Sequence, residues 1–407
     1  MELPRIISAD DHVIEAPDVW TSRLPSKFVD RAPRVKREKG VMNRAAGGWN
    51  PDPDAPGAKW ADVWYYETMV FPLIRGYAHS GYESDDALNL ITYDDILPST
   101  WKRAERFVDM DKNHTDVSLC YPSITRFCGQ IFLEQEDKEL SLLCVQAFND
   151  WMIDEWCGTE RPARLIPLTM IPLWDAELAS EEIRRCADKG SHAVMFSECP
   201  PYLNLPSIYS GWWDPMFRAC DETDTVINIH VGSSSNLIST APDAPPDMGL
   251  CLTYVNSLLS LTDWLYSGVF ELFPSLRVAL AESQAGWIPF AAQRVDNTWK
   301  KGNEKWTESV AKATRRATVL PSSQLDGHIF ACIFDDLEGL RNRDLIGMKH
   351  LLFETDFPHA DSTFPHSLKT AEELVTMAGL NEQETYQFLR GNAIDLFKLD
   401  KYFGIDH

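Results

Sequence analysis

The sequence has 407 residues, of which 44% are hydrophobic and 24% charged, and its net charge is −23. This composition indicates a globular protein with enough chain for a large core. The acidic excess argues against nucleic acid or an anionic membrane surface as a partner. Nine cysteines, never arranged as C-x-x-C, favour a reducing compartment. The polar N-terminus does not resemble a signal peptide, and no run approaches the roughly 20 apolar residues of a spanning helix, so we expect a cytoplasmic protein.

The first predicted strand is the short apolar run at residues 5–7, which ends in acids and a histidine. Residues two apart in a strand share a face, so Asp10 and His12 are expected to point the same way and suit a divalent metal. The following segment, residues 23–98, is rich in Pro, Gly, Trp and Tyr. We expect it to be an irregular insertion that forms a lid or pocket wall over the end of the first strand, or a subunit contact.

From residue 100 onward, helical patterns alternate with short apolar runs. The further predicted strands are residues 116–122, 163–168, 192–196, 225–230, 277–281, 328–333 and 350–355. The predicted helices are residues 100–114, 134–156, 175–189, 212–221, 252–270, 286–299, a short one near 337, 368–378 and 382–397. Eight apolar strands, most of them followed by a helix, predict an α/β fold, a (β/α)8 TIM barrel that forms one domain over residues 1–407. An open doubly wound sheet is the alternative, but the Gly-rich phosphate loop expected after its first strand is missing.

Acidic and histidine residues recur where the predicted strands end. His230 ends the fifth strand, Glu282 follows the sixth, and Asp356 ends the eighth. In a barrel of this kind the carboxyl ends of the strands form the active site, so these residues should meet Asp10 and His12. Together they are candidate metal ligands.

The arrangement resembles that of a known family. The Asp10-x-His12 pair, His230 followed by Val-Gly, and the run Thr355–His359 are similar to motifs of the amidohydrolase-related barrels grouped with aminocarboxymuconate-semialdehyde decarboxylase. The resemblance extends over almost the whole chain, including Arg390–Ala393 near the end. It implies a metal ion held by Asp10, His12, His230 and Asp356.

One turn departs from the decarboxylase pattern. Where those proteins carry a histidine after the sixth strand, this sequence has Glu282, and an anion near a metal is more readily a ligand or bridge than a proton donor. The fourth strand has no lysine for a carbamate bridge, and Glu282 could fill that role. Glu15 and His359 could complete a second metal site; alternatively, Glu15 pins the start of a helix, His359 acts as an acid or base, and Glu282 forms a structural ion pair.

Such a carboxylate-rich ligand set resembles the family's dinuclear non-heme iron monooxygenases, the branch that includes 2-aminoisobutyrate hydroxylase and the diterpenoid hydroxylase of platensimycin assembly. It implies two iron ions, dioxygen, an external ferredoxin or reductase, and hydroxylation of an unactivated C–H bond in a small carboxylated or terpenoid-type substrate, with Glu282 and His359 as catalytic residues. The first alternative is a decarboxylase or hydrolase with one Zn or Mn ion. The second is a metal-binding partner subunit of a hetero-oligomeric enzyme. A homo-oligomer, in the form of a dimer, is expected for this family.

Overall fold

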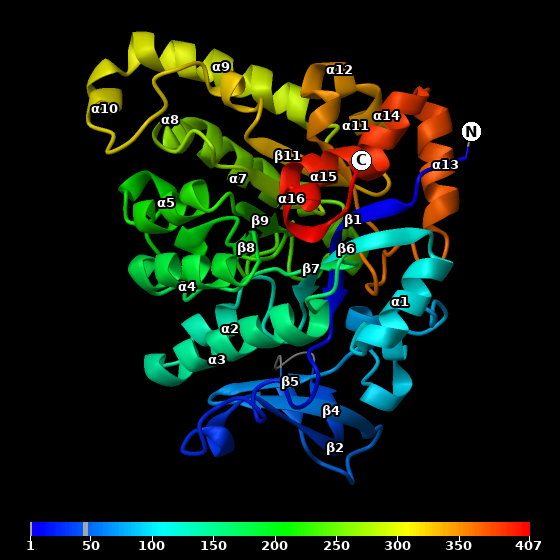
Figure 1. The fold of residues 1–407 in the computed structure, drawn as a ribbon. Coiled ribbons are helices and arrows are strands. Elements are labelled where there is room, and N and C mark those ends of the chain that lie inside the picture. Colours follow the sequence, from blue (N-terminus) through cyan, green and yellow to red (C-terminus); the bar gives the residue numbers. More distant parts are fainter. Residues whose placement is uncertain (1, 44–47) are drawn as a thin grey trace.

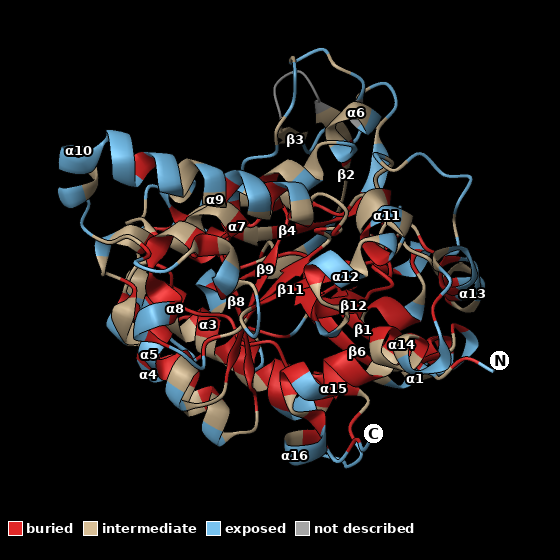
Figure 2. Cartoon of the chain, turned by 90° about the horizontal axis from the view of Figure 1, so that it is seen from above, coloured by how far each residue is buried: buried red, intermediate tan, exposed pale blue. Residues whose placement is uncertain are grey.

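The computed structural model describes residues 2–43 and 48–407, and its core is a barrel of parallel strands (Figure 1). Eight strands build it, in the order predicted: β1 (Ile6–Val13), β6 (Thr115–Pro122), β7 (Leu165–Ile166), β8 (Ala193–Phe196), β9 (Val226–His230), β10 (Val278–Ala281), β11 (Ile329–Ile333) and β12 (Leu351–Phe353). Every residue of β1 and of β8 to β12 is buried, as expected for strands covered on both faces (Figure 2).

The strands pair in two parallel groups that join into a ring. One group runs β1-β6-β7 and the other β8-β9-β10-β11-β12. A parallel bridge between Thr169, just after β7, and Val194 of β8 connects the groups on one side. On the other side, the Asp356 amide donates to the Asp10 carbonyl at 3.0 Å. This contact closes the barrel and brings the ends of the first and last strands together.

Helices surround the barrel and present their exposed faces to solvent (Figure 2). They are α1 (Arg103–Lys112), α2 (Gln130–Leu133), α3 (Lys138–Trp151), α4 (Ala176–Asp188), α5 (Asp214–Glu222), α6 (Pro246–Leu250), α7 (Thr253–Ser267), α8 (Val269–Leu272), α9 (Ile288–Lys305), α10 (Thr307–Ala311), α11 (Leu337–Arg341), α12 (Arg343–Ile346), α13 (Ser367–Ala378), α14 (Glu382–Tyr386), α15 (Asn392–Phe397) and α16 (Leu399–Phe403). The helix predicted from residue 134 begins at Lys138 because the Asp137 carboxylate caps it by accepting from the Leu140 amide.

The segment between β1 and β6 differs from the irregular insertion expected for residues 23–98. It forms a four-stranded antiparallel sheet from β2 (Arg34–Asn43), β3 (Gly48–Asn50), β4 (Lys59–Tyr66) and β5 (Met69–Pro72); residues 44–47 of the segment lie outside the described residues. Four consecutive residues of β4, Ala61 to Trp64, are buried, and Trp64 packs edge-to-face against Trp20 in the core. Its roles as a lid and as a subunit contact stay predictions.

Across the described residues we find no helix with the length and apolar character needed to traverse a bilayer. The cytoplasmic location stays a prediction.

Candidate metal centre

Four side chains from three distant strand ends converge inside the barrel mouth. The His12 Nε2 atom lies 3.6 Å from Asp10 Oδ1, 3.1 Å from Asp356 Oδ1 and 3.2 Å from His230 Nε2. The His230 Nε2 atom lies 3.4 Å from Asp10 Oδ2. All four side chains are at most 1% exposed. The barrel therefore brings together four of the five residues that the strand-end pattern selected; the fifth, Glu282, lies at the edge of the centre.

The two carboxylates of this cluster lack hydrogen bonds. Both carboxylate oxygens of Asp10 and both of Asp356 are buried without a hydrogen-bond partner among the described residues. Atoms that coordinate one ion at about 2.1 Å lie roughly 3.0–3.5 Å from each other, which resembles the observed separations. A buried carboxylate without a partner is costly, and a cation would supply the missing interaction. The residues therefore fit a metal ion, and the donor set of two imidazoles and two carboxylates suits a divalent transition metal.

The pKa shifts of the clustered side chains also favour a metal ion at this centre. Burial raises the pKa of the Asp10 carboxyl well above its ordinary value, and the nearby Glu354, Asp356 and Glu282 carboxylates raise it further. Burial also lowers the pKa of His230 to about 3, which keeps this imidazole neutral. The raised pKa of Asp10 reflects buried negative charges that lack a balancing cation, and a bound divalent ion would supply it. The neutral imidazole is the form of histidine that binds a metal.

The orientation of His230 is fixed by contacts on its other atoms. Its Nδ1 lies 2.6 Å from the Val231 carbonyl, so Nδ1 carries the proton and Nε2 keeps a free lone pair toward Asp10. The Phe127 ring stacks on the imidazole with centroids 4.0 Å apart and an interplanar angle of 12°. Nothing in the sequence around Phe127 signalled this contact, because it depends on how two loops meet.

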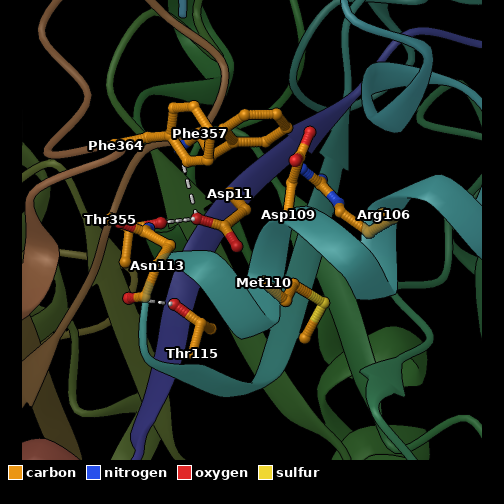
Figure 3. Close-up of a pocket in the computed structure, with 9 residues that line it drawn as sticks. All are labelled: Asp11, Arg106, Asp109, Met110, Asn113, Thr115, Thr355, Phe357 and Phe364. Carbon is orange, nitrogen blue, oxygen red and sulfur yellow. Dashed lines mark hydrogen bonds between the residues drawn. The ribbon is translucent and has the colours of Figure 1, made fainter.

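Asp11, between the two predicted ligands of β1, ties the strand ends together (Figure 3). Its Oδ1 accepts from the Thr355 hydroxyl, from the Ser8 hydroxyl at 3.0 Å and from the Phe357 amide at 3.2 Å. Its Oδ2 accepts from the Ser118 hydroxyl of β6. The carboxylate thus holds the residues on both sides of Asp356 against β1, and we expect it to set the distance between Asp356 and Asp10.

An Asp11→Asn variant is expected to fold but to bind divalent metal about 10- to 100-fold more weakly, because an amide cannot accept from all four donors. Competition with a chelator measures the metal affinity, and circular dichroism checks the fold. Asp109→Asn is the matched control, since Asp109 lines the same small pocket as Asp11 but pairs with Lys112. If Asp11→Asn binds the metal as tightly as wild type does, the hydrogen bonds of the Asp11 carboxylate do not position the metal ligands.

Glu282 and His359 lie at the edge of this centre, on the side of an open cavity of about 670 Å³. Glu282 Oε2 is 3.8 Å from His230 Nε2. The His359 ring stacks on His12 with centroids 3.7 Å apart, and its Nδ1 lies 2.9 Å from Asp356 Oδ1. Burial lowers the pKa of His359 to about 4. Both side chains can therefore contact a molecule in the cavity while touching the predicted ligands.

The backbone is strained at two of these positions. Glu282 and Asp356 have φ angles of 51°, in the left-handed region that residues other than glycine seldom adopt. Such strain costs on the order of 1–3 kcal/mol per residue and gathers where a site requires a particular side-chain direction. Here it turns both carboxylates toward the same centre.

Glu15 does not join the other predicted ligands. Its buried carboxylate accepts from the backbone amides of Ser123, Ile124 and Thr125 and from the Thr125 hydroxyl. Both oxygens thus hold the loop after β6, which leads to Phe127. The structure therefore gives Glu15 a positioning contact in place of the predicted metal contact.

The sequence interpretation missed two carboxylates of the centre. Glu354 is buried, its Oε2 accepts from the Glu282 amide at 3.1 Å, and its Oε1 has no partner among the described residues. A signal existed, because Glu354 precedes Asp356 by two residues and so shares its face of an extended strand. Asp361 offers an oxygen within 4.8 Å of oxygens from Glu282 and Asp356. It follows the strand in a loop, where sequence spacing gives no direction.

Comparison with known proteins agrees with this geometry. A family model described as "Amidohydrolase" matches residues 61–399. Gamma-resorcylate decarboxylase from Rhodococcus jostii (strain RHA1) is 23% identical over 283 residues, which is 65% of this chain and 79% of the relative. The 2-amino-3-carboxymuconate-6-semialdehyde decarboxylase from Dictyostelium discoideum is 24% identical over 317 residues, which is 75% of this chain and 79% of the relative.

Solved structures share the fold over the whole length. An amidohydrolase from Mycobacterium avium subsp. paratuberculosis K-10 superposes with a TM-score of 0.70 at 20% identity, over 98% of this chain and 100% of that one. A 5-carboxyvanillate decarboxylase from Novosphingobium aromaticivorans DSM 12444, in complex with manganese and 4-hydroxy-3-methoxy-5-nitrobenzoic acid, superposes with a TM-score of 0.62 at 15% identity, over 97% and 96% of the two chains. The predicted barrel is confirmed.

The expectation of a dinuclear iron monooxygenase is wrong. The curated relatives are decarboxylases, and they favour the alternative of a metal-dependent decarboxylase or hydrolase. Dioxygen and an external electron donor were expected only for a monooxygenase, so they are not part of the function proposed below. The carboxylate count that suggested two iron ions included Glu15, whose oxygens bind backbone amides.

Proposed function

Since this chain belongs to the amidohydrolase family, we propose that it is a metal-dependent decarboxylase of a small, ring-containing carboxylic acid. The observation that carries the proposal is the set of buried Asp10 and Asp356 oxygens that face two imidazoles without hydrogen bonds. The decarboxylase relatives support the reaction type. Hydrolysis, the other use of such a centre, remains the second candidate because the family model itself is described as amidohydrolase.

We propose that Asp10, His12, His230 and Asp356 hold one manganese or zinc ion. Such an ion, when bound, acts as a Lewis acid that polarises a substrate oxygen and orients the carboxylate. Glu15 is left out of this ligand set, since its oxygens accept from the amides of residues 123–125. The group formed by Glu282, Asp356 and Asp361 could accommodate a second ion, so the metal content of the purified protein decides the number.

Glu282 is the residue we propose for proton transfer. When carbon dioxide leaves, the electrons of the broken C–C bond stay on the ring carbon, which must then take a proton. Glu282 lines the cavity, and its side chain is 16% exposed, so a bound substrate can reach it. His359 lines the same cavity; its Nε2 is buried without a partner among the described residues, and its Nδ1 lies 2.9 Å from Asp356 Oδ1, so it is the second candidate for moving a proton.

Metal removal tests the proposed reaction. Purified protein is incubated with carboxyl-labelled benzoic acids bearing hydroxyl or amino groups, and labelled carbon dioxide is collected. Release from at least one compound is expected, with loss of at least about 10³-fold after chelation and recovery on adding Mn²⁺ or Zn²⁺. Metal-dependent cleavage of amides or esters without any carbon dioxide release would favour the hydrolase instead.

A further inference from the structure

The residues that line the cavity beside the centre are of two chemical kinds. Apolar and aromatic side chains come from the segment after β5, from the loops after β6 and β9, and from α6 and α7: Ile74, Tyr77, Phe127, Leu237, Leu250 and Tyr254. The chain after β10, β11 and β12 adds the polar side chains Gln284, Asp335 and Asp361. Such a lining can hold an apolar ring and still offer polar partners to its substituents.

The polar residues of the cavity lining offer hydrogen-bond acceptors. The Gln284 amide donates from Nε2 to Asp335 Oδ1 at 2.6 Å, which turns its carbonyl oxygen away from Asp335. That oxygen, Oε1, is buried and has no partner among the described residues. Asp335 and Asp361, which are both exposed, add carboxylate oxygens to the cavity lining. A ligand group that donates hydrogen bonds would pair with the buried Gln284 oxygen, whereas another acceptor would leave that oxygen unpaired.

Positive charge is missing from the same surface. Among the described residues that line the cavity there is neither a lysine nor an arginine. The charge of Arg126 acts on the pKa of the cavity residue Tyr77, but Arg126 is ion-paired with Glu134. A second anionic group on a substrate would therefore meet carboxylates without a balancing cation.

We propose that the cavity selects a monocarboxylic acid whose ring carries a hydrogen-bond donor, preferably an amine, and rejects a second carboxylate. The inference rests on the proposed function, because the single carboxylate is the group that would meet the metal. Asp335, held by Gln284, is the specificity-determining residue. Leaving the buried Gln284 oxygen unpaired, or bringing a second carboxylate close to Asp335 and Asp361, weakens binding by about 10- to 100-fold.

Matched ligands test the selection. Aminobenzoic acids and the benzenedicarboxylic acids of the same ring positions are titrated into manganese-loaded protein, with ligand-detected NMR to record weak binding. We expect the tightest-binding aminobenzoic acid to bind at least about 10-fold more tightly than the benzenedicarboxylic acid of the same ring positions. In Asp335→Asn this ratio should fall about 10-fold, whereas Asp344→Asn, an exposed acid outside the cavity lining, should keep it. An equal or reversed preference in the wild type, or an unchanged ratio in Asp335→Asn, overturns the inference.

The same titrations on metal-stripped protein separate the inference from the proposed function. If carboxylates bind equally well with and without manganese, the proposed function fails. Aniline and benzoate as one-group probes then still measure the preference for a donor, so the inference stands or falls on their ratio. If binding depends on manganese but aminobenzoic acids and benzenedicarboxylic acids bind equally tightly, only the inference about ligand selection fails.

Discussion

A Glu282→Gln variant is expected to keep its metal and lose roughly 10²- to 10⁴-fold in kcat for carbon dioxide release, the range for removal of a general acid. Gln has the shape of Glu and can still contact His230, but it cannot give a proton to the ring carbon. The measurement pairs turnover with metal analysis of the same preparation. Glu338→Gln is the control, because Glu338 lies near the same loop with a side chain that is 65% exposed.

The two results together separate the roles of Glu282. Loss of turnover with full metal content supports proton transfer. Loss of metal together with turnover would make Glu282 a ligand, as the sequence interpretation first held. Unchanged turnover would remove Glu282 from the chemistry and leave His359 as the remaining acid or base on the cavity side of the centre.

An Asp356→Asn variant is expected to lose at least about 10³-fold in turnover and most of its metal affinity, yet to unfold at a higher temperature than wild type when both are metal-free. Asp356 is fully buried, neither oxygen has a partner among the described residues, and burial raises its pKa well above the ordinary value. An amide removes that uncompensated charge, a gain of about 1–3 kcal/mol. The backbone does not oppose the change, since Asn tolerates the left-handed φ of 51°.

Thermal unfolding of wild type and Asp356→Asn, each with and without Mn²⁺, tests whether the variant is the more stable protein without metal and the less stable one with metal. Wild type should gain about 2.7 kcal/mol at a metal concentration 100 times Kd, and the variant should gain almost nothing. Asp296→Asn is the control, because both oxygens of Asp296 already accept hydrogen bonds from Ser322. The stability of Asp296→Asn relative to wild type should be the same with and without Mn²⁺. A metal-free Asp356→Asn that is less stable than metal-free wild type would contradict the view that this carboxylate awaits a cation.

Much of the barrel could be predicted because its signals are local. The expected strands at 225–230, 277–281 and 328–333 match β9, β10 and β11 to within one residue at either end. Strands buried on both faces read as unbroken apolar runs, and helices that follow them read as amphipathic repeats. The segment before residue 100 was predicted as irregular chain because its many Pro and Gly residues are typical of loops, and the antiparallel sheet of β2 to β5 between them was missed.

The positions of Asp10, His12, His230 and Asp356 at one mouth of the barrel could be predicted from the chain alone, because each lies at or near the end of an apolar strand and parallel barrel strands end at the same mouth. Which carboxylates remain free for a cation became visible only in the folded protein. Glu15 and Asp11 are also acids close to the end of the first strand, but their oxygens accept hydrogen bonds from amides and hydroxyls, most of them in residues more than 100 positions away. A strand end depends on neighbouring residues, whereas the hydrogen-bond partners of a buried carboxylate come largely from loops that meet only when the chain has folded.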